Sequence, residues 1–167
     1  MAAPDPPKKI PFTIPLAAGP VAPWLDRLAA ALVLAAAVAA VAVLWPLTPD
    51  PRGFDTHTQL GLSPCSWPEH YGYPCPTCGS TTAACHVVHG QLLRAFAVQP
   101  FGAAVAVAGL LLAAHAAVCL LRKRSFADLL VRLPGRRVLL GAVLLLLAAW
   151  GYVAFAWRFL HSASLSK

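Results

Sequence analysis

The chain has 167 residues, of which 59% are hydrophobic and only 11% are charged. An ordinary soluble domain is about 45–50% apolar and about 25% charged, and a fold this short buries only about two-thirds of its surface. The composition and the mean hydropathy of +0.67 therefore exclude a soluble globular domain and a disordered chain. They predict an integral membrane protein.

The net charge of +7 does not indicate nucleic-acid binding, because six of the thirteen Lys and Arg residues lie between Arg122 and Arg137. A short basic loop beside apolar segments is typical of a cytoplasmic connection between membrane spans. We expect the lipid bilayer as partner, with another membrane protein as the candidate protein partner, and no nucleic acid.

Residues 1–23 contain seven prolines, which predicts a proline-rich tail outside any helix. Three apolar runs follow, at about 28–45, 101–121 and 138–157, and none of them contains a proline. Each run is long enough to cross a bilayer as a helix. A cleaved signal peptide is the alternative for the first run, but its length and its long leader favour a retained span.

The predicted fold is therefore all-α, with a three-span membrane domain over residues 24–160 and a short tail at 161–167. The loop at 46–100 carries Arg52 and Arg94 against three acidic residues, so it is less basic than the loop at 122–137. The positive-inside rule then predicts a cytoplasmic N-terminus and an extracytoplasmic first loop. The predicted location is the inner (cytoplasmic) membrane of a bacterium.

Four of the five cysteines lie in this first loop: Cys65, Cys75, Cys78 and Cys85. We predict a short helix over 81–89 that is capped by Ser80 or Thr81 and ends at Gly90. An amphipathic turn at 91–98 should follow, with Arg94 and Gln99 towards water. Helical spacing puts Thr82, Cys85, His86 and His89 on one face of the short helix.

Three chemical interpretations of this loop stay open. Two disulfides among Cys65, Cys75, Cys78 and Cys85 would staple a proline-rich loop in an oxidising compartment. A metal site, with zinc as the candidate ion, would use Cys75, Cys78 and Cys85 with His86 or His89. Thiol–disulfide exchange would use Cys75 and Cys78, because a Cys-x-x-Cys pair at a helix N-terminus has a lowered thiol pKa.

The segment from Cys75 to Thr81 also resembles an uncharacterised family, of the domain-of-unknown-function kind, of small bacterial multi-pass membrane proteins with a Cys-Pro-x-Cys-Gly-x-Thr loop motif. The resemblance covers about Cys65 to Val118, and the chain departs from the pattern at Thr82 (Arg in the family) and Gln99 (Asn in the family). The matching residues are Cys65, Gly72, Pro74, Cys75, Pro76, Cys78, Gly79, Thr81, Ala83, Gly90, Ala95 and Pro100. The resemblance implies a membrane protein with a cysteine-containing loop and implies no known reaction.

Three further residues, all outside the motif, carry side chains that could take part in chemistry. His115 lies in the middle of a predicted span, where an ionisable residue is a functional candidate, although hydrogen bonding across helices is the favoured explanation. Cys119 is expected to fill space as a small apolar side chain. His57 is expected to be solvated.

The sequence contains no recognisable Ser/His/Asp set, phosphate loop or paired-carboxylate site. We therefore expect an accessory or scaffold membrane protein rather than an enzyme, with a loop held by disulfides or metal. The alternative is a redox or zinc-handling protein that uses Cys75 and Cys78.

Overall fold

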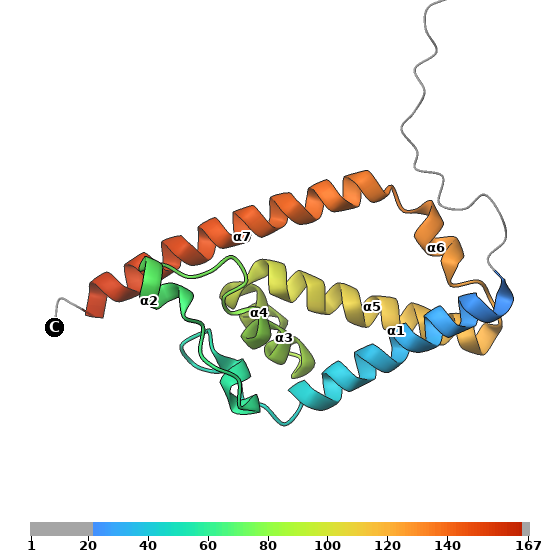
Figure 1. Ribbon diagram of the computed structural model, residues 1–167, viewed down its shortest axis with the longest axis horizontal. Coiled ribbons are helices and arrows are strands. Elements are labelled where there is room, and N and C mark those ends of the chain that lie inside the picture. Colours follow the sequence, from blue (N-terminus) through green and yellow to red (C-terminus); the bar gives the residue numbers. More distant parts are fainter. Residues whose placement is uncertain (1–21, 165–167) are drawn as a thin grey trace, which may run out of the picture.

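The computed structural model describes residues 22–164, and the side chains of residues 22–158. The described part is all-helical, which confirms the predicted fold class, while most of the predicted proline-rich tail lies outside it. Figure 1 shows the order of the elements. They are α1 (Pro23–Leu44), the 3₁₀ turn η1 (Thr56–Leu60), α2 (Trp67–Tyr71), α3 (Ser80–Val88), α4 (Leu92–Val98), α5 (Pro100–Arg122), α6 (Ala127–Arg132) and α7 (Gly135–Ser164).

Three of these helices are long and apolar enough to cross a membrane: Pro23–Leu44, Pro100–Arg122 and Gly135–Arg158. Both α1 and α5 begin at a proline, which fits the first turn of a helix because its missing N–H has no intrahelical partner there. Helix α7, which contains the third of these spans, continues beyond the expected end of the span, to Ser164.

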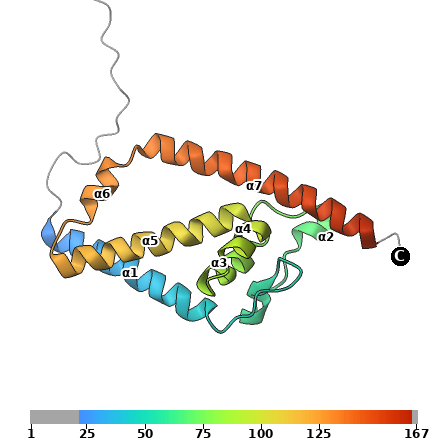
Figure 2. The same ribbon diagram turned by 180° about the vertical axis from the view of Figure 1, so that it is seen from behind.

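Helices α1 and α5 run side by side in opposite directions (Figures 1 and 2). Their contact is built largely from small side chains, and Ala30 and Ala116 are fully buried in it with Cys119 and Phe126. Small residues let two membrane helices approach closely, so van der Waals packing holds them together in a solvent that is itself apolar.

The short elements form a layer at one end of this pair. Helices α3 and α4 pack on the first turns of α5 through Ala83, Val87, Ala95 and Ala103. Gly102 is essential to this approach, because a Cβ added there would lie 2.7 Å from the Cα of Ser80. We call the segment 45–99 the loop layer.

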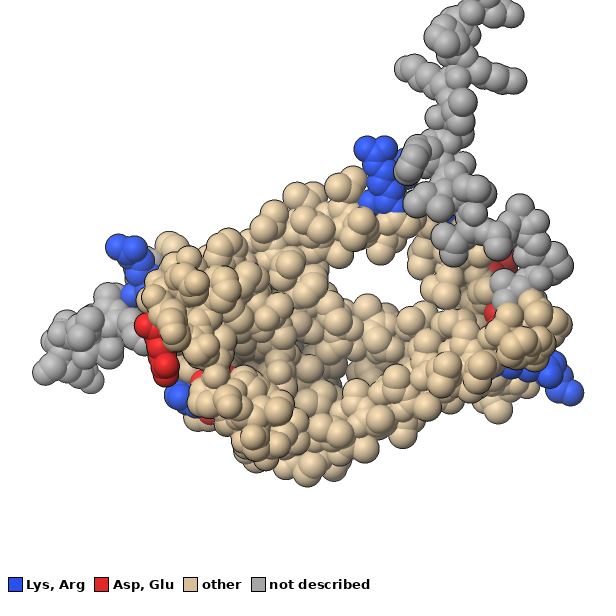
Figure 3. Space-filling view, viewed as in Figure 1, with Lys and Arg blue, Asp and Glu red and all other residues tan. Residues whose placement is uncertain are grey.

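Helix α7 is joined to the loop layer by residues just past its middle. The indole Nε1 of Trp150 donates to the carbonyl of Pro74 at 3.0 Å, and the Tyr152 hydroxyl donates to the carbonyl of Ala97 at 2.8 Å. Further towards its N-terminus the helix diverges, and Figure 3 shows an opening between α7 and the α1–α5 pair.

The opposite end of the molecule is organised by Asp26. Its carboxylate is buried and accepts hydrogen bonds from the backbone N–H groups of Phe126 and Ala127 and from the Ser125 hydroxyl. One side chain thus ties the start of α1 to the chain that follows α5.

Three local expectations can now be compared with the structure. The N-cap of α3 is Gly79, not Ser80 or Thr81, because the chain enters the helix from a left-handed turn with φ 85° that favours glycine. Gly90 does end the helix, also with a positive φ, and the N–H groups of Gly90 and Gln91 satisfy carbonyls of the last turn.

The expectation that Gln99 faces water is wrong. Its side chain is fully buried and accepts from the N–H of Phe101 and more weakly from that of Gly102, so it caps α5. An amide at this position is stable when buried because the helix terminus supplies free donors.

Candidate metal centre

The structure brings the thiols of Cys65, Cys75 and Cys78 together. Their sulfur atoms all lie within 4.8 Å of one another. Cys78 is buried, whereas Cys65 and Cys75 are partly exposed. The three residues come from two separate stretches of the loop layer, one just before α2 and one just before α3.

The Cys75–Cys78 segment is a pair of overlapping turns. The N–H of Cys78 donates to the carbonyl of Cys75, and the N–H of Ser80 donates to that of Thr77, both at 3.0 Å. Gly79 completes the turn with its positive φ, and a Cβ there would lie 2.7 Å from the carbonyl oxygen of Gly53. Glycine is therefore required here for two reasons: the positive φ disfavours other residues, and the nearby carbonyl of Gly53 leaves no room for a side chain.

Two hydrogen bonds hold these turns in place from outside. The Gln99 side chain donates to the carbonyl of Pro76 at 2.9 Å, and Trp150 donates to that of Pro74. Thus the start of α5 and the side of α7 both fix the backbone next to Cys75.

Cys65 is positioned by its own set of contacts. Its backbone N–H donates to Oδ1 of Asp55 at 3.3 Å, and its sulfur accepts from the backbone N–H of Trp67. A backbone N–H aimed at sulfur stabilises the thiolate, which is the form that binds metal.

The thiols open into a cavity of about 280 Å³ between η1 and the start of α3. Threonines and two further ionisable groups share its wall. The lining residues are Asp55, His57, Cys65, Cys75, Thr77, Cys78, Gly79, Thr81 and Thr82.

The electrostatics of the cavity disfavour a thiolate in the absence of a cation. Burial raises the pKa of Cys78 to about 12, and negative charge on Cys75, Cys65 and Asp55 adds to the effect. Burial also raises the pKa of Cys65. A bound dication would reverse this balance, because coordination deprotonates a thiol outright.

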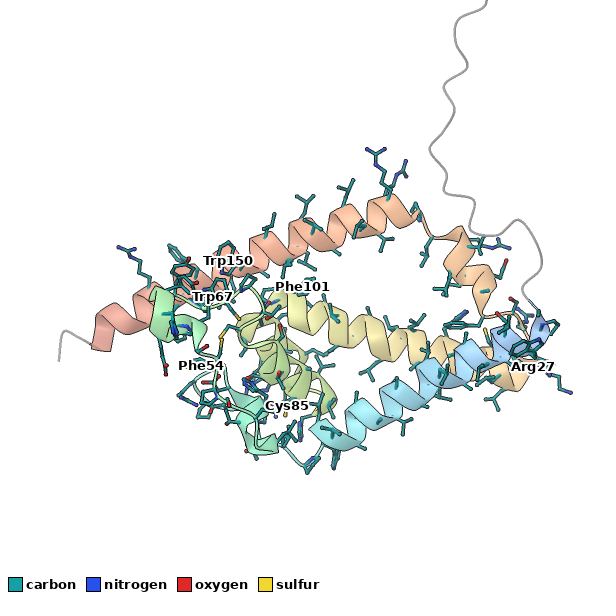
Figure 4. The ribbon with its side chains drawn as sticks, in the orientation of Figure 1. Arg27, Phe54, Trp67, Cys85, Phe101 and Trp150 are labelled. Atoms are coloured by element: carbon teal, nitrogen blue, oxygen red, sulfur yellow. The ribbon has the colours of Figure 1, made fainter. Side chains whose placement is uncertain are left out.

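The other residues of the predicted metal set lie elsewhere. The Cys85 thiol is buried and donates to the carbonyls of Leu47 at 3.3 Å and Leu44 at 3.7 Å. His86 bonds the side chain of Gln91 at 2.8 Å, and His89 stacks on Trp45 with ring centroids 5.4 Å apart. The structure therefore does not join Cys85, His86 or His89 to the thiol cluster. Figure 4 labels Cys85 among the side chains of the loop layer, with Arg27 at the far end of α1.

The remaining candidate, His115, contacts Cys119 in its own helix, with Nε2 and Sγ 3.5 Å apart, and its ring lies 5.8 Å from that of Phe126. Helix packing thus accounts for the neighbours of His115.

All five cysteines are free thiols.

Two residues that line the cavity, Asp55 and His57, are not among the site residues expected from the sequence. Asp55 is buried, and His57, which was expected to be solvated, is half-buried and lines the cavity. The available sequence signal was their position in the same loop as the cysteines, and nothing in their spacing distinguishes them from ordinary loop residues.

No curated protein and no solved structure matches this chain. A family model does match, which confirms the resemblance to a family without an assigned activity, and it covers the cysteine segment and the first half of α5. Residues 65–113 of this membrane protein match the family described as Protein of unknown function (DUF2752).

Proposed function

We propose that this chain is an accessory membrane protein whose loop layer carries a zinc centre at Cys65, Cys75 and Cys78. The observation that carries the proposal is the convergence of three sulfur atoms within 4.8 Å from two separate stretches of chain. Thiolates are preferred zinc ligands, and three of them supply most of a tetrahedral set.

The number of thiols in the cluster favours a metal over a pair of disulfides. Pairing four cysteines needs Cys85, whose thiol instead donates to the carbonyls of Leu44, the last residue of α1, and of Leu47 just beyond it. A disulfide within the cluster would leave the third thiol without a partner.

Thiol–disulfide exchange by Cys75 and Cys78 is the second candidate function, since both sulfurs lie in one open cavity. An attacking cysteine needs a lowered pKa. Burial raises the pKa of Cys78 to about 12, so Cys78 is unsuited to be the attacking thiol and the more exposed Cys75 would have to attack.

The metal content of the purified, full-length protein tests these candidates. Protein extracted in mild detergent under reductant should contain stoichiometric zinc, measured by elemental analysis. Cys78→Ser should lose the metal, and Cys85→Ser should keep it, since Cys85 lies outside the cluster.

Two outcomes would reject the zinc centre. Free, alkylatable thiols in wild-type protein without any metal would leave only packing roles for the cysteines. A mixed disulfide trapped between Cys75 and another protein in the Cys78→Ser variant would establish exchange.

We also propose that the loop layer faces the extracytoplasmic side of a bacterial inner membrane, with the N-terminus in the cytoplasm. The basic residues between Arg122 and Arg137 support this orientation. Reporter fusions should place residue 130 inside and residue 70 outside; the reverse result would reject the orientation.

A protein partner in the membrane fits the exposed aromatic residues of the loop layer. Trp67, Tyr71 and Tyr73 are all exposed, and the ring of Tyr71 lies 4.7 Å from that of Trp67 and 6.1 Å from that of Tyr73. Aromatic side chains are enriched in protein interfaces and at the membrane–water boundary.

A further inference from the structure

The proposed zinc centre has three protein ligands where a structural zinc site has four. The cavity in front of the thiols contains one imidazole, that of His57. Among the histidines whose side chains the structure describes, the others are occupied elsewhere: His70 with Ser66, His86 with Gln91, His89 with Cys85 and Trp45, and His115 with Cys119.

The two residues that precede His57 anchor its backbone. Asp55, directly before η1, adopts a left-handed conformation with φ 63° and accepts the N–H of Cys65. The fully buried Thr56 bonds the hydroxyl of Thr82 in α3 at 2.8 Å. The turn that carries His57 is thus fastened to the segment of one ligand cysteine and to the helix that follows the other two.

The hydrogen bond of the His57 ring determines which nitrogen is free. Nε2 lies 3.0 Å from the carbonyl oxygen of Ser63. A carbonyl only accepts, so Nε2 carries the proton and Nδ1 of the neutral ring keeps its lone pair. Within residues 22–158, Nδ1 of His57 makes no hydrogen bond.

This arrangement is the one found around metal-bound histidines. Such a ring almost always donates its second N–H to a carbonyl, a carboxylate or water, which fixes its orientation and increases the basicity of the ligand nitrogen. Here the accepting carbonyl belongs to Ser63, two residues before Cys65, so the histidine and the cysteine are held by the same short segment.

His57 lines the cavity, but its ring nitrogens lie outside the group of ligand atoms that are within 4.8 Å of one another. We propose that on metal binding the His57 ring moves towards the thiols and that its Nδ1 becomes the fourth ligand of a Cys₃His site with Cys65, Cys75 and Cys78. The inference rests on the proposed zinc centre and assigns its missing ligand. Asp55 acts behind this set, because its carboxylate already holds the backbone of Cys65.

Cobalt binding to the full-length protein in detergent, under reductant, tests the assignment. Co²⁺ reports its ligands directly, since thiolate-to-metal charge-transfer bands count sulfurs and the d–d bands respond to geometry and to the fourth ligand. The wild type should show a tetrahedral spectrum with three thiolates.

His57→Ala should keep the thiolate bands, shift the d–d bands and weaken cobalt binding by about 100-fold or more, since loss of an outer-shell partner alone costs about 10–100-fold. Added imidazole should restore the wild-type spectrum, which a misfolded variant would not do. His70→Gln is the matched control, because His70 is an exposed histidine of the same loop layer and lies outside the cavity. Asp55→Asn should weaken binding without shifting the d–d bands.

An unchanged spectrum and affinity in His57→Ala would overturn the assignment of His57. A shift of the d–d bands in Asp55→Asn instead would assign the fourth position to the carboxylate. Absence of any cobalt spectrum in the wild type would reject the zinc centre itself, so failure of the fourth ligand and failure of the proposed function are distinguishable.

Discussion

Cys85 of α3 lies near the C-terminal end of α1, and Cys119 of α5 lies near its N-terminal end. Each contacts a histidine four residues away, which is His89 at the C-cap of α3 and His115 within α5. The Cys85 thiol donates to carbonyls at the end of α1 and just beyond it, and the Cys119 thiol donates to the carbonyl of Ser125 at 3.7 Å. We call these two residues the helix thiols.

The cluster of Cys65, Cys75 and Cys78 differs in each respect. Its members lie outside the long helices, their sulfurs face one another, and they border an open cavity. Cys and His at helical spacing therefore place two candidate ligands on one face of a helix but do not supply the remaining ligands of a metal site. Convergence of two loop segments instead brings three thiols together here.

The largest difference should appear in cysteine alkylation. In reduced, metal-free protein the pKa of Cys78 is raised from 9.0 to about 12. The thiolate fraction at neutral pH, and with it the alkylation rate, should therefore be about 1000-fold lower than in the unfolded chain. Peptide mass spectrometry across a pH series, with denatured protein as control, measures both rates.

The same shift has a consequence for stability with a definite sign. The folded thiol holds its proton more tightly than the unfolded one, so the stability it contributes is present below the unfolded pKa of 9.0 and is lost as the pH rises towards about 12. An ordinary titration midpoint for Cys78 in the folded chain would contradict the burial of this thiol.

Gly79→Ala should disrupt the cluster and leave the helix thiols in place. The alanine adds strain at a positive φ and a contact with the carbonyl of Gly53, which together should lower the free energy of unfolding by about 1–3 kcal/mol and abolish stoichiometric zinc binding. Thermal unfolding in one fixed detergent and elemental analysis are the measurements.

Gly61→Ala is the matched control for Gly79→Ala. Gly61 also has a positive φ, of 78°, but a Cβ there meets nothing within 4 Å. Its variant should keep the metal and be less destabilised. Equal losses in the two variants would show that close packing at Gly79 contributes nothing.

The hydrogen bond between Thr56 of η1 and Thr82 of α3 can be removed from either side, with different expected losses of stability. The Thr56 hydroxyl bonds that of Thr82 and accepts the N–H of Asp50 at 3.0 Å. Thr56→Val leaves two partners unsatisfied and should cost about 1–3 kcal/mol, whereas Thr82→Val should cost about 1 kcal/mol. Chemical or thermal unfolding measures both, and the reverse order would refute the proposed role of Thr56.

The smallest effect is expected at a helix thiol. In Cys119→Ser the hydroxyl can still donate to the carbonyl of Ser125, so the loss of stability should stay below about 1 kcal/mol. Zinc content should be unchanged, as measured on the purified variant. A loss of metal would show that the two groups of thiols are coupled through α5.

The spans and the short α3 could be predicted from the sequence because they depend on apolar length and on local signals such as Pro100 and Gly90. The approach of Cys65 to the Cys75–Cys78 turns could not, because it depends on Asp55, Gln99 and Trp150 meeting backbone groups 10, 23 and 76 residues away in the chain. The burial of Gln99 could not be predicted for the same reason. A polar side chain is expected to be exposed, and only the structure shows that the free N–H groups at the start of α5 surround it.

Helix α7 diverges from the α1–α5 pair and leaves an opening between them (Figure 3). In a membrane, lipid chains would contact the helices on both sides of this opening. Leu139, Leu144 and Leu147 on this helix are all exposed, so the described part of the chain leaves these apolar side chains uncovered. A bilayer must fill this volume with acyl chains, whose ordering and length then enter the free energy of the assembled state. Lipid composition is for this reason a thermodynamic variable of the fold itself.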